Sequence, residues 1–283
     1  MAMNRADLHI HTTASDGLHA PADIVRMAKE AGLAAIAVTD HDTMAGTEEA
    51  VEAGRRFGVE VVPGVEISTS AEGIDVHVLA YYPDWRNDEW LSRLAGLRDM
   101  RADRNARMIA KLRGLGIPIT LEEVERKAGK LDDPEKTVGR PHMAEVLVDK
   151  GIVGSVREAF DRYLAAGAAA YVNPPRIHPF EAVDWIREAG GTSVLAHPGL
   201  YGNDALVEEI VKYGVRGIEV FHSDHGEDEE NRYAALAERY GLIVTGGSDF
   251  HGERESGAFH GPIGGRTVDA AVLRKLNPAA RGG

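Results

Sequence analysis

Asp7-Leu8-His9-Ile10-His11 opens the chain with the alternation of a buried strand. Side chains alternate across an extended strand, so His9 and His11 project from one face while Leu8 and Ile10 pack on the other. Two imidazoles on one strand can chelate a single ion. Asp7 shares their face, where a carboxylate can orient an imidazole through the ring nitrogen that does not bind metal. A His-x-His pattern by itself is a weak indication, so the rest of the chain has to support it.

Short apolar runs alternate with stretches of helical period on both sides of the middle of the chain. In the first half, this pattern predicts helices over residues 21–31 and 43–57 and strands over 34–39 and 59–67. In the second half, it predicts helices over 182–189, 204–213 and 231–240 and strands over 192–196, 217–221 and 242–245. Repeated βα units predict parallel strands with the functional site at their C-terminal ends.

The middle of the chain has a different character. Residues 90–114 form a long amphipathic pattern, and charged helix-like stretches surround Leu121, Val146 and Phe160. Asn173-Pro174-Pro175 marks the return to the βα pattern, because consecutive prolines restrict the backbone and remove hydrogen-bond donors. We therefore expect a catalytic domain formed in two parts by residues 1–84 and 173–283, with a helical insertion over residues 85–172.

Composition limits the chemistry. The 283 residues are 43% hydrophobic, which is enough for a substantial core, and the chain contains no cysteine. Disulfides and thiolate metal sites are therefore excluded, and histidine nitrogen with carboxylate oxygen favours manganese, iron or zinc. The first residues, Met1 to Arg5, lack the apolar core of a signal peptide, and no apolar run approaches the roughly 18 to 20 residues that span a bilayer. We expect a cytoplasmic protein without membrane contact.

The net charge of −13 argues against binding to a long nucleic acid, because such binding relies on Lys and Arg to neutralise phosphates. Small anions are compatible with this charge. Two or three divalent ions in one pocket bring about four to six positive charges, which outweigh the surface charge locally. A small phosphorylated substrate therefore remains compatible with an acidic chain.

Further candidate ligands follow the predicted strands. They are found in Ser15-Asp16-Gly17, Thr39-Asp40-His41-Asp42, Pro63-Gly64-Val65-Glu66, Asp75-Val76-His77, Ala196-His197-Pro198 and Gly247-Ser248-Asp249-Phe250-His251. Each one alone could be structural, as a buried histidine bonded to backbone, a capping aspartate or a solvated glutamate. Six segments that carry His, Asp or Glu at the same end of a βα fold together predict a multi-metal site.

These motifs, in this order, resemble the polymerase-and-histidinol-phosphatase (PHP) family across both halves of the chain. The resemblance implies a distorted βα barrel of about seven strands that holds two or three divalent ions at its C-terminal rim. We expect manganese, with zinc or iron as alternatives. Carried over residue by residue, the family pattern assigns His9, His11, Glu66 and Asp249 to one ion, Asp16, His41 and His251 to a second, and Glu66, His77 and His197 to a third. Glu66 would bridge ions.

Gly139-Arg140-Pro141-His142 stands at the start of a predicted helix in the insertion. Proline suits the first helical turn, and the Arg140 guanidinium can offer a planar fork to phosphate, so Arg140 and His142 are candidate substrate-binding residues. The alternative is a helix-start motif with a surface arginine, and His142 could also replace or join a ligand of the third ion. Within the family, this motif together with Gly-Gly-Ser-Asp-Phe-His resembles nucleoside 3',5'-bisphosphate phosphatases and short-RNA 5'-to-3' exonucleases.

Metal coordination lowers the pKa of water by many units, so neither a serine nor a cysteine nucleophile is required. Glu66 and Asp249 are expected to be catalytic through the ions. The leaving sugar oxygen needs a proton, and His222 at the end of a predicted strand could donate it, although a packed or solvent-facing histidine fits equally well. Surface or capping roles are expected for the remaining histidines, which are His19, His178, His225 and His260.

We expect a metal-dependent phosphatase that removes the 3'-phosphate of a nucleoside 3',5'-bisphosphate such as phosphoadenosine phosphate. The alternatives are a 5'-to-3' exonuclease on short RNA, a histidinol-phosphate phosphatase, and a noncatalytic PHP module that binds metal and supports an assembly. The complete set of ligands argues against the noncatalytic module.

Overall fold

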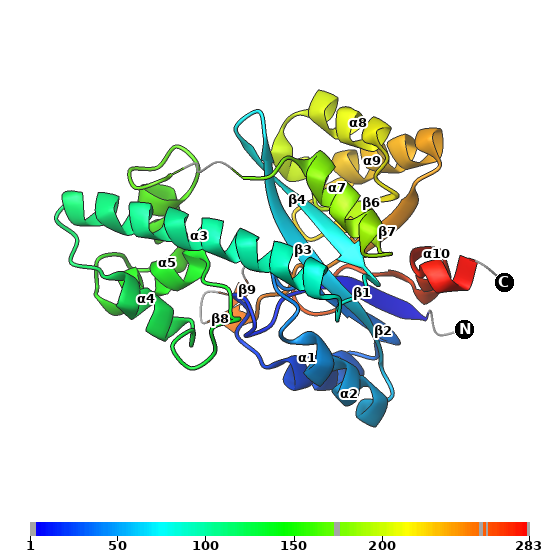
Figure 1. The fold of residues 1–283 in the computed structure, drawn as a ribbon, viewed down its shortest axis with the longest axis horizontal. Helices are drawn as coiled ribbons and strands as arrows, with labels where there is room; N and C mark the ends of the chain where they lie inside the picture. The colour runs from blue at the N-terminus through cyan, green and yellow to red at the C-terminus, as the bar shows by residue number, and fades with distance from the viewer. Residues whose placement is uncertain (1–3, 173–175, 255–256, 259, 282–283) are drawn as a thin grey trace.

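A mixed sheet of eight strands forms the centre of the molecule, and helices pack on its outside (Figure 1). The computed structural model describes residues 4–172, 176–254, 257–258 and 260–281. Along the sheet, the strands follow the order β10-β1-β2-β3-β4-β5-β6-β7. Their bounds are β1 Arg5–Ile10, β2 Ala35–Val38, β3 Glu60–Ala71, β4 Ile74–Tyr81, β5 Thr192–Leu195, β6 Gly217–His222, β7 Ile243–Gly247 and β10 Val268–Asp269.

The sheet nearly closes into a barrel where β1 meets the end of β7. The backbone N–H of Asp249 donates to the carbonyl of His9 at 2.8 Å, and that of His11 donates to the carbonyl of Phe250 at 3.0 Å. An isolated parallel bridge joins Ile10 to Phe250. The predicted α/β fold with a distorted barrel is therefore confirmed, and β10 adds a short eighth strand to the expected seven.

The helices of the barrel lie close to their predicted positions. They are α1 Pro21–Glu30, α2 Thr47–Phe57, α7 Pro179–Glu188, α8 Asp204–Tyr213, α9 Glu227–Tyr240 and the short α10 Leu273–Leu276. Two begin earlier than predicted because polar residues cap them: His178 and Glu181 form a capping box before α7, and Glu229 accepts the backbone N–H of Gly226 at the start of α9. A two-stranded sheet of β8 Glu253–Arg254 and β9 Gly257–Ala258 lies apart from the barrel sheet.

The parallel pairing expected of βα units is interrupted at β4, which runs antiparallel to both β3 and β5. Only Glu72 and Gly73 connect β3 to β4, and both have positive φ, of 51° and 79°. A two-residue connection makes a hairpin, since a parallel crossover requires a dozen or more residues. β10 also pairs antiparallel with β1.

The insertion contains α3 Asp88–Gly114, α4 Leu121–Lys127, α5 Arg140–Asp149 and α6 Val156–Ala159, followed by a π-helical turn over Phe160–Leu164. In Figure 1, α4 and α5 lie to one side of the barrel, and α3 runs from the barrel to them. Trp90 near the start of α3 packs in the barrel core, whereas Met108 packs in a separate core formed within residues 108–170. Helical structure is thus found where it was expected, and the domain boundaries stay a prediction. Asn173-Pro174-Pro175 lies outside the described residues.

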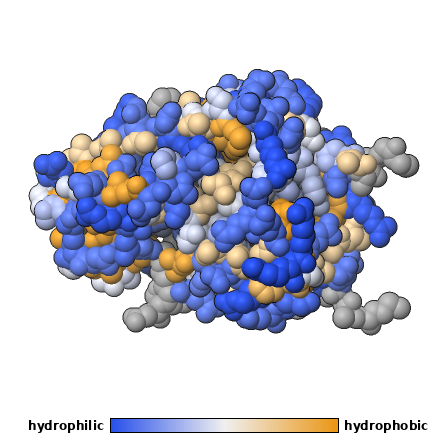
Figure 2. Space-filling model, turned by 60° about the horizontal axis from the view of Figure 1, so that its bottom comes forward, coloured by the Kyte–Doolittle hydropathy of each residue, from blue (hydrophilic) through white to orange (hydrophobic). Residues whose placement is uncertain are grey.

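Hydrophilic residues cover most of the face shown in Figure 2, with hydrophobic residues in smaller patches between them. Among the described residues, no helix is both long enough and apolar enough to cross a membrane.

Candidate metal centre

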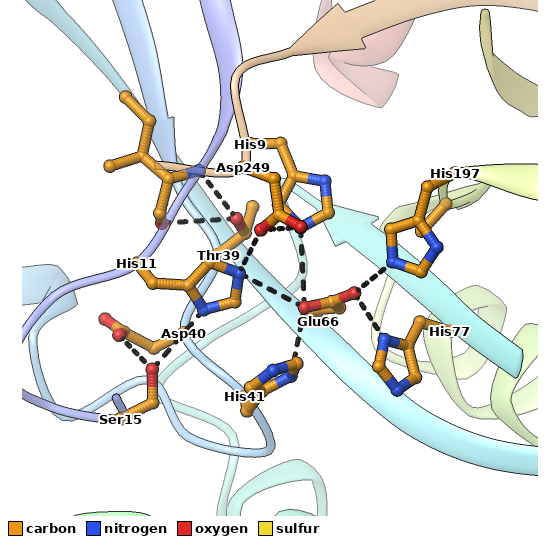
Figure 3. Close-up of polar contacts among 12 residues, drawn as sticks. His9, His11, Ser15, Thr39, Asp40, His41, Glu66, His77, His197 and Asp249 are labelled. Atoms are coloured by element: carbon orange, nitrogen blue, oxygen red, sulfur yellow. Dashed lines mark hydrogen bonds and ion pairs between the residues drawn. The ribbon is translucent and has the colours of Figure 1, made fainter. Parts of the chain in front are cut away.

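Four side chains from distant parts of the chain meet at one end of the barrel (Figure 3). His11 Nε2 lies 3.0 Å from Asp249 Oδ1 and 3.2 Å from Glu66 Oε2. His9 Nε2 lies 3.4 Å from each of the same two oxygens. His9 lies on β1 and His11 directly follows it, β3 supplies Glu66, and the segment after β7 supplies Asp249. These are the four residues that were predicted to hold the first ion.

A second group adjoins the first. His251 Nε2 lies 3.3 Å from Asp16 Oδ1, and His41 Nε2 lies 3.9 Å from Asp16 Oδ2. His11 Nδ1 is 3.7 Å from Asp16 Oδ1, so His11 stands between this group and the first. The three residues predicted for the second ion are therefore close together, and ligation by them stays a prediction.

Glu66 connects the first group to a third. Its Oε2 faces the first group, while its Oε1 lies 2.7 Å from His77 Nδ1 and 3.0 Å from His197 Nε2. His41 Nδ1 also lies 2.9 Å from Oε2. This carboxylate therefore lies among three groups of candidate ligand atoms, and its bridging role stays a prediction.

The buried atoms of this cluster fit divalent ions. Several of them have no hydrogen-bond partner: His9 Nε2, His11 Nε2, Asp16 Oδ1, His41 Nδ1, Glu66 Oε2 and Asp249 Oδ1. A buried polar atom without a partner is costly, so a group of six that point toward one another requires an explanation. Imidazole nitrogens and carboxylate oxygens are ligands that manganese, zinc and iron accept.

The backbone at two of these residues is strained. Asp249 has a φ of 53° and His197 a φ of 22°, a region that non-glycine residues rarely adopt. The hydrogen bond from the Asp249 N–H to the His9 carbonyl, at 2.8 Å, holds the first of these conformations. Strain of this kind is found mainly at functional sites, where the surrounding structure maintains it.

The electrostatics of the cluster keep its carboxylates ionised. Burial alone would raise the pKa of Glu66, but the surrounding imidazoles hold it well below its usual range. The pKa of Asp249 and that of Asp16 are also well below the usual range for the same reason. Burial lowers the pKa of His41 to about 4. Burial would also lower the pKa of His11, but the adjacent carboxylates of Asp249 and Glu66 outweigh it and raise the pKa to about 10.

Glu219, which the sequence did not single out, orients the first histidine. Its Oε1 lies 3.1 Å from His9 Nδ1, and its Oε2 accepts the backbone N–H of His197 at 2.9 Å. Burial would raise the pKa of Glu219, but interaction with His9 keeps it below its usual value. A glutamate within the apolar strand Gly217–His222 was the signal that could have revealed it.

The expectation that Asp7 orients an imidazole is wrong. Its carboxylate accepts the backbone N–H of Ser248 at 2.9 Å, the Ser248 hydroxyl at 2.6 Å and the backbone N–H of Gly264 at 2.8 Å. Asp7 thus fixes the segment that precedes Asp249, and Glu219 occupies the position beside His9.

His222 and His260 lie on the other side of Asp249. His222 is fully buried, and its Nδ1 accepts the backbone N–H of Asp224 at 3.1 Å, so its Nε2 carries the proton toward Asp249 Oδ2 at 3.3 Å when the ring is neutral. His260 Nε2 is also 3.3 Å from Asp249 Oδ2, while its Nδ1 contacts Asp224. His260 lines the cavity beside the cluster, which corrects the expected surface role, whereas His222 is absent from that lining.

The other histidines differ in their positions. His178 caps α7, as expected. His225 is buried, with its Nδ1 2.8 Å from the carbonyl of Val220 and its Nε2 accepting the backbone N–H of Gly199, so a surface role is wrong for it. His19 stacks on Phe250 with ring centroids 5.9 Å apart.

A cavity of about 210 Å³ opens beside the cluster. The candidate ligands other than His9 and His11 line one part of it, and four arginines line another: Arg101, Arg104, Arg140 and Arg176. The arginine that the sequence predicted is therefore in the cavity, where Arg140 Nη2 lies 3.2 Å from Asp75 Oδ2. His142 Nδ1 instead accepts the backbone N–H of Gly139 at 3.0 Å, which caps α5, and His142 is absent from the lining.

Comparison with known proteins gives a consistent result. The PHP domain matches residues 7–134. A 3',5'-nucleoside bisphosphate phosphatase from Chromobacterium violaceum is 35% identical over 260 residues, which are 90% of each chain. The 5'-3' exoribonuclease Rnm from Escherichia coli is 36% identical over 252 residues, 87% of this chain and 84% of the relative.

The solved structure of a candidate metal-dependent phosphoesterase from Bifidobacterium adolescentis has a TM-score of 0.87 at 32% identity, and the match covers 96% of this chain and 94% of the other. The likeness thus extends over both halves of the barrel and over the insertion. With the ligand cluster at the barrel end, these matches show that the chain belongs to the PHP domain family of metal-dependent phosphoric ester hydrolases.

Proposed function

We propose that this enzyme removes the 3'-phosphate of nucleoside 3',5'-bisphosphates, such as phosphoadenosine phosphate. The observation that carries the proposal is a single cavity in which a His and carboxylate cluster adjoins a set of arginines. Such a cavity suits a small substrate with more than one phosphate group. The bisphosphate phosphatase from C. violaceum, 35% identical to this chain, supports the same substrate class.

We propose two or three divalent ions, with manganese as the preferred metal and zinc or iron as alternatives. The first ion would be held by His9, His11, Glu66 and Asp249, the second by Asp16, His41 and His251, and the third by Glu66, His77 and His197. When bound, the ions would supply a water of lowered pKa and positive charge for the phosphate oxygens.

The residues of the chain supply position and charge for the reaction. In the reaction, a water oxygen forms a bond to the 3'-phosphorus, the bond from phosphorus to O3' breaks, and O3' takes a proton. Glu66 and Asp249 remain ionised at neutral pH because their pKa values are depressed, so they retain their full charge as ligands. His260 reaches into the cavity and is better placed than the buried His222 to give the leaving oxygen its proton.

The proposal is tested by phosphate release from adenosine 3',5'-bisphosphate by the metal-loaded enzyme. We expect the products to be adenosine 5'-monophosphate and inorganic phosphate, identified by chromatography. Release of the 5'-phosphate instead, or negligible turnover at saturating manganese, would remove this substrate. Histidinol phosphate in a parallel assay distinguishes the remaining phosphomonoesterase alternative.

Exonucleolytic trimming of short RNA from its 5' end is a second candidate. The exoribonuclease from E. coli, 36% identical to this chain, supports it. The same bond between phosphorus and O3' would break in a diester, so one site can serve both reactions. A 5'-phosphorylated tetranucleotide, compared with the bisphosphate by kcat/KM, ranks the two substrates.

A further inference from the structure

The candidate ligand Asp16 lies in a turn that follows β1, so its position depends on how this turn is held. The backbone N–H of Gly17 donates to the Thr12 carbonyl at 2.9 Å, which closes the turn around Asp16. The backbone N–H of Leu18 donates to the His251 carbonyl at 2.9 Å. The turn is therefore tied to a second candidate ligand of the same group.

Asp40, which follows β2, holds the turn from one side. Its Oδ1 accepts the backbone N–H of Thr12 at 2.7 Å, and its Oδ2 accepts the Thr12 hydroxyl at 2.7 Å. Figure 3 shows the Asp40 carboxylate bonded to Ser15, beside His11; the Ser15 hydroxyl donates to Asp40 Oδ1 at 2.6 Å. Since Asp40 is buried and makes all these bonds, the turn has little freedom to move.

The insertion holds the same turn from the other side, through residues 135–139. The backbone N–H of Thr137 donates to the Ala14 carbonyl at 3.0 Å. The Thr43 hydroxyl, in the loop after β2, donates to the Glu135 carbonyl at 3.1 Å. This segment of the insertion thus packs against both of the loops that follow β1 and β2.

Gly139, which precedes α5, touches Asp16 directly. A Cβ at this position would lie 2.7 Å from Asp16 Oδ2, a distance at which one of the two residues has to shift. The backbone of Gly139, with φ −98° and ψ 171°, is extended and open to any residue. Serine is also a better residue than glycine at the N-cap of a helix. The space beside Asp16, rather than conformation or capping, therefore requires glycine here.

The contact matters because both oxygens of Asp16 face the second group of candidate ligands. Oδ1 lies 3.3 Å from His251 Nε2, and Oδ2 lies 3.9 Å from His41 Nε2. Ligand distances in metal sites vary by only about 0.2 Å. A Cβ that pushed Asp16 away, or pushed α5 away from the turn, would change this geometry.

We propose that Gly139 is a positioning residue for Asp16, so that the start of α5 forms one wall of the second ion's site. This inference rests on the second ion proposed above. It makes the insertion a part of the metal centre. Because coupling between two binding events is reciprocal, binding of the second ion and docking of residues 135–139 then stabilise each other.

The experiment measures bound manganese after dialysis, and manganese affinity by competition with a chelator, in Gly139→Ala and Gly139→Ser. We expect both variants to keep their circular dichroism spectrum and to bind the second ion about 10- to 100-fold more weakly. Serine restores the helix cap that alanine removes, so an effect in both variants separates the contact with Asp16 from capping. Gly114→Ala is the matched control in the insertion, because a Cβ there would meet nothing in the described residues within 4 Å beyond its neighbours on α3.

A double-mutant cycle tests whether Gly139 acts through Asp16. Asp16→Ala removes both the second ion's ligand and the oxygen that a Cβ at Gly139 would meet. In this background, Gly139→Ala should leave the remaining manganese affinity unchanged. A further loss as large as in the wild-type background would show that Gly139 acts elsewhere and would overturn the inference.

Hydrogen exchange of the wild-type protein gives a readout that does not depend on the variants or on their folding. We expect saturating manganese to slow amide exchange in residues 133–146, which include the start of α5. Exchange in α4, at residues 121–127 of the same insertion, should change less. Equal exchange of residues 133–146 with and without manganese would contradict the coupling.

The outcomes separate this inference from the proposals on which it rests. Unchanged manganese affinity in both Gly139 variants, or full recovery in Gly139→Ser, would overturn the positioning role while the second ion and the phosphatase proposal stand. Fewer than two equivalents of manganese bound by the wild type at saturation would instead overturn the second ion, and this inference with it.

Discussion

Glu66→Gln removes one negative charge from the middle of the ligand cluster and leaves the shape of the side chain nearly unchanged. The Glu66 oxygens lie between 2.7 and 3.4 Å from ring nitrogens of His9, His11, His41, His77 and His197. At an effective dielectric constant of 20, one unit charge at 4 Å from another contributes about 4 kcal/mol. Since each 1.36 kcal/mol is a factor of ten, we expect kcat/KM to fall by about a thousandfold or more.

The assay measures phosphate release from adenosine 3',5'-bisphosphate in saturating manganese, together with the metal content after dialysis. Glu66→Gln should retain its circular dichroism spectrum and lose at least one equivalent of bound metal. Glu60→Gln is the matched control, because Glu60 is an exposed residue at the other end of the same strand. Activity within tenfold of the wild type at full metal content would refute the central position of Glu66.

In Glu219→Gln, the side chain no longer offers two carboxylate oxygens to His9 Nδ1 and the His197 N–H. Metal affinity, measured by competition with a chelator, should therefore fall about 10- to 100-fold. An unchanged affinity would contradict the positioning role of Glu219. The raised pKa of His11, about 10, keeps this ring protonated near pH 7 in the metal-free protein, so metal binding should release protons and tighten from pH 6 to pH 8. Calorimetric heats that are the same in buffers of different ionisation enthalpy would contradict that release. Among the described residues that line the cavity, none has an amide side chain that could read a base edge. The kcat/KM values for the adenosine, guanosine, cytidine and uridine bisphosphates should therefore agree within about tenfold. A larger preference would indicate base recognition.

The local sequence was sufficient to predict those helices and strands that depend on interactions between neighbouring residues. The apolar alternation of β1 and the helical periods of α1 and α8 depend on neighbouring residues, and the structure has these elements close to the predicted bounds. Glu66 and Asp249 were expected at one site because parallel strands bring their C-terminal ends together, and the structure places both beside His11.

Other features depend on long-range pairing, which periodicity does not encode. The reversed direction of β4 follows from a two-residue turn, and a buried strand reads the same in either direction. Glu219 and Arg104 look like ordinary charged residues in the sequence, and only folding removes them from water and places them beside His9 and beside the cavity.

The sequence by itself determined which residue types can bind metal, because the chain contains no cysteine and its histidines and carboxylates follow predicted strands. Tertiary structure alone decided which atoms face one another: the two oxygens of Glu66 divided between neighbouring groups, and four arginines gathered around two carboxylates. The physical reason is that charge and ligand chemistry belong to a side chain wherever it lies. Distance and burial, which set the strength of those interactions, exist only after segments far apart in the chain have packed together.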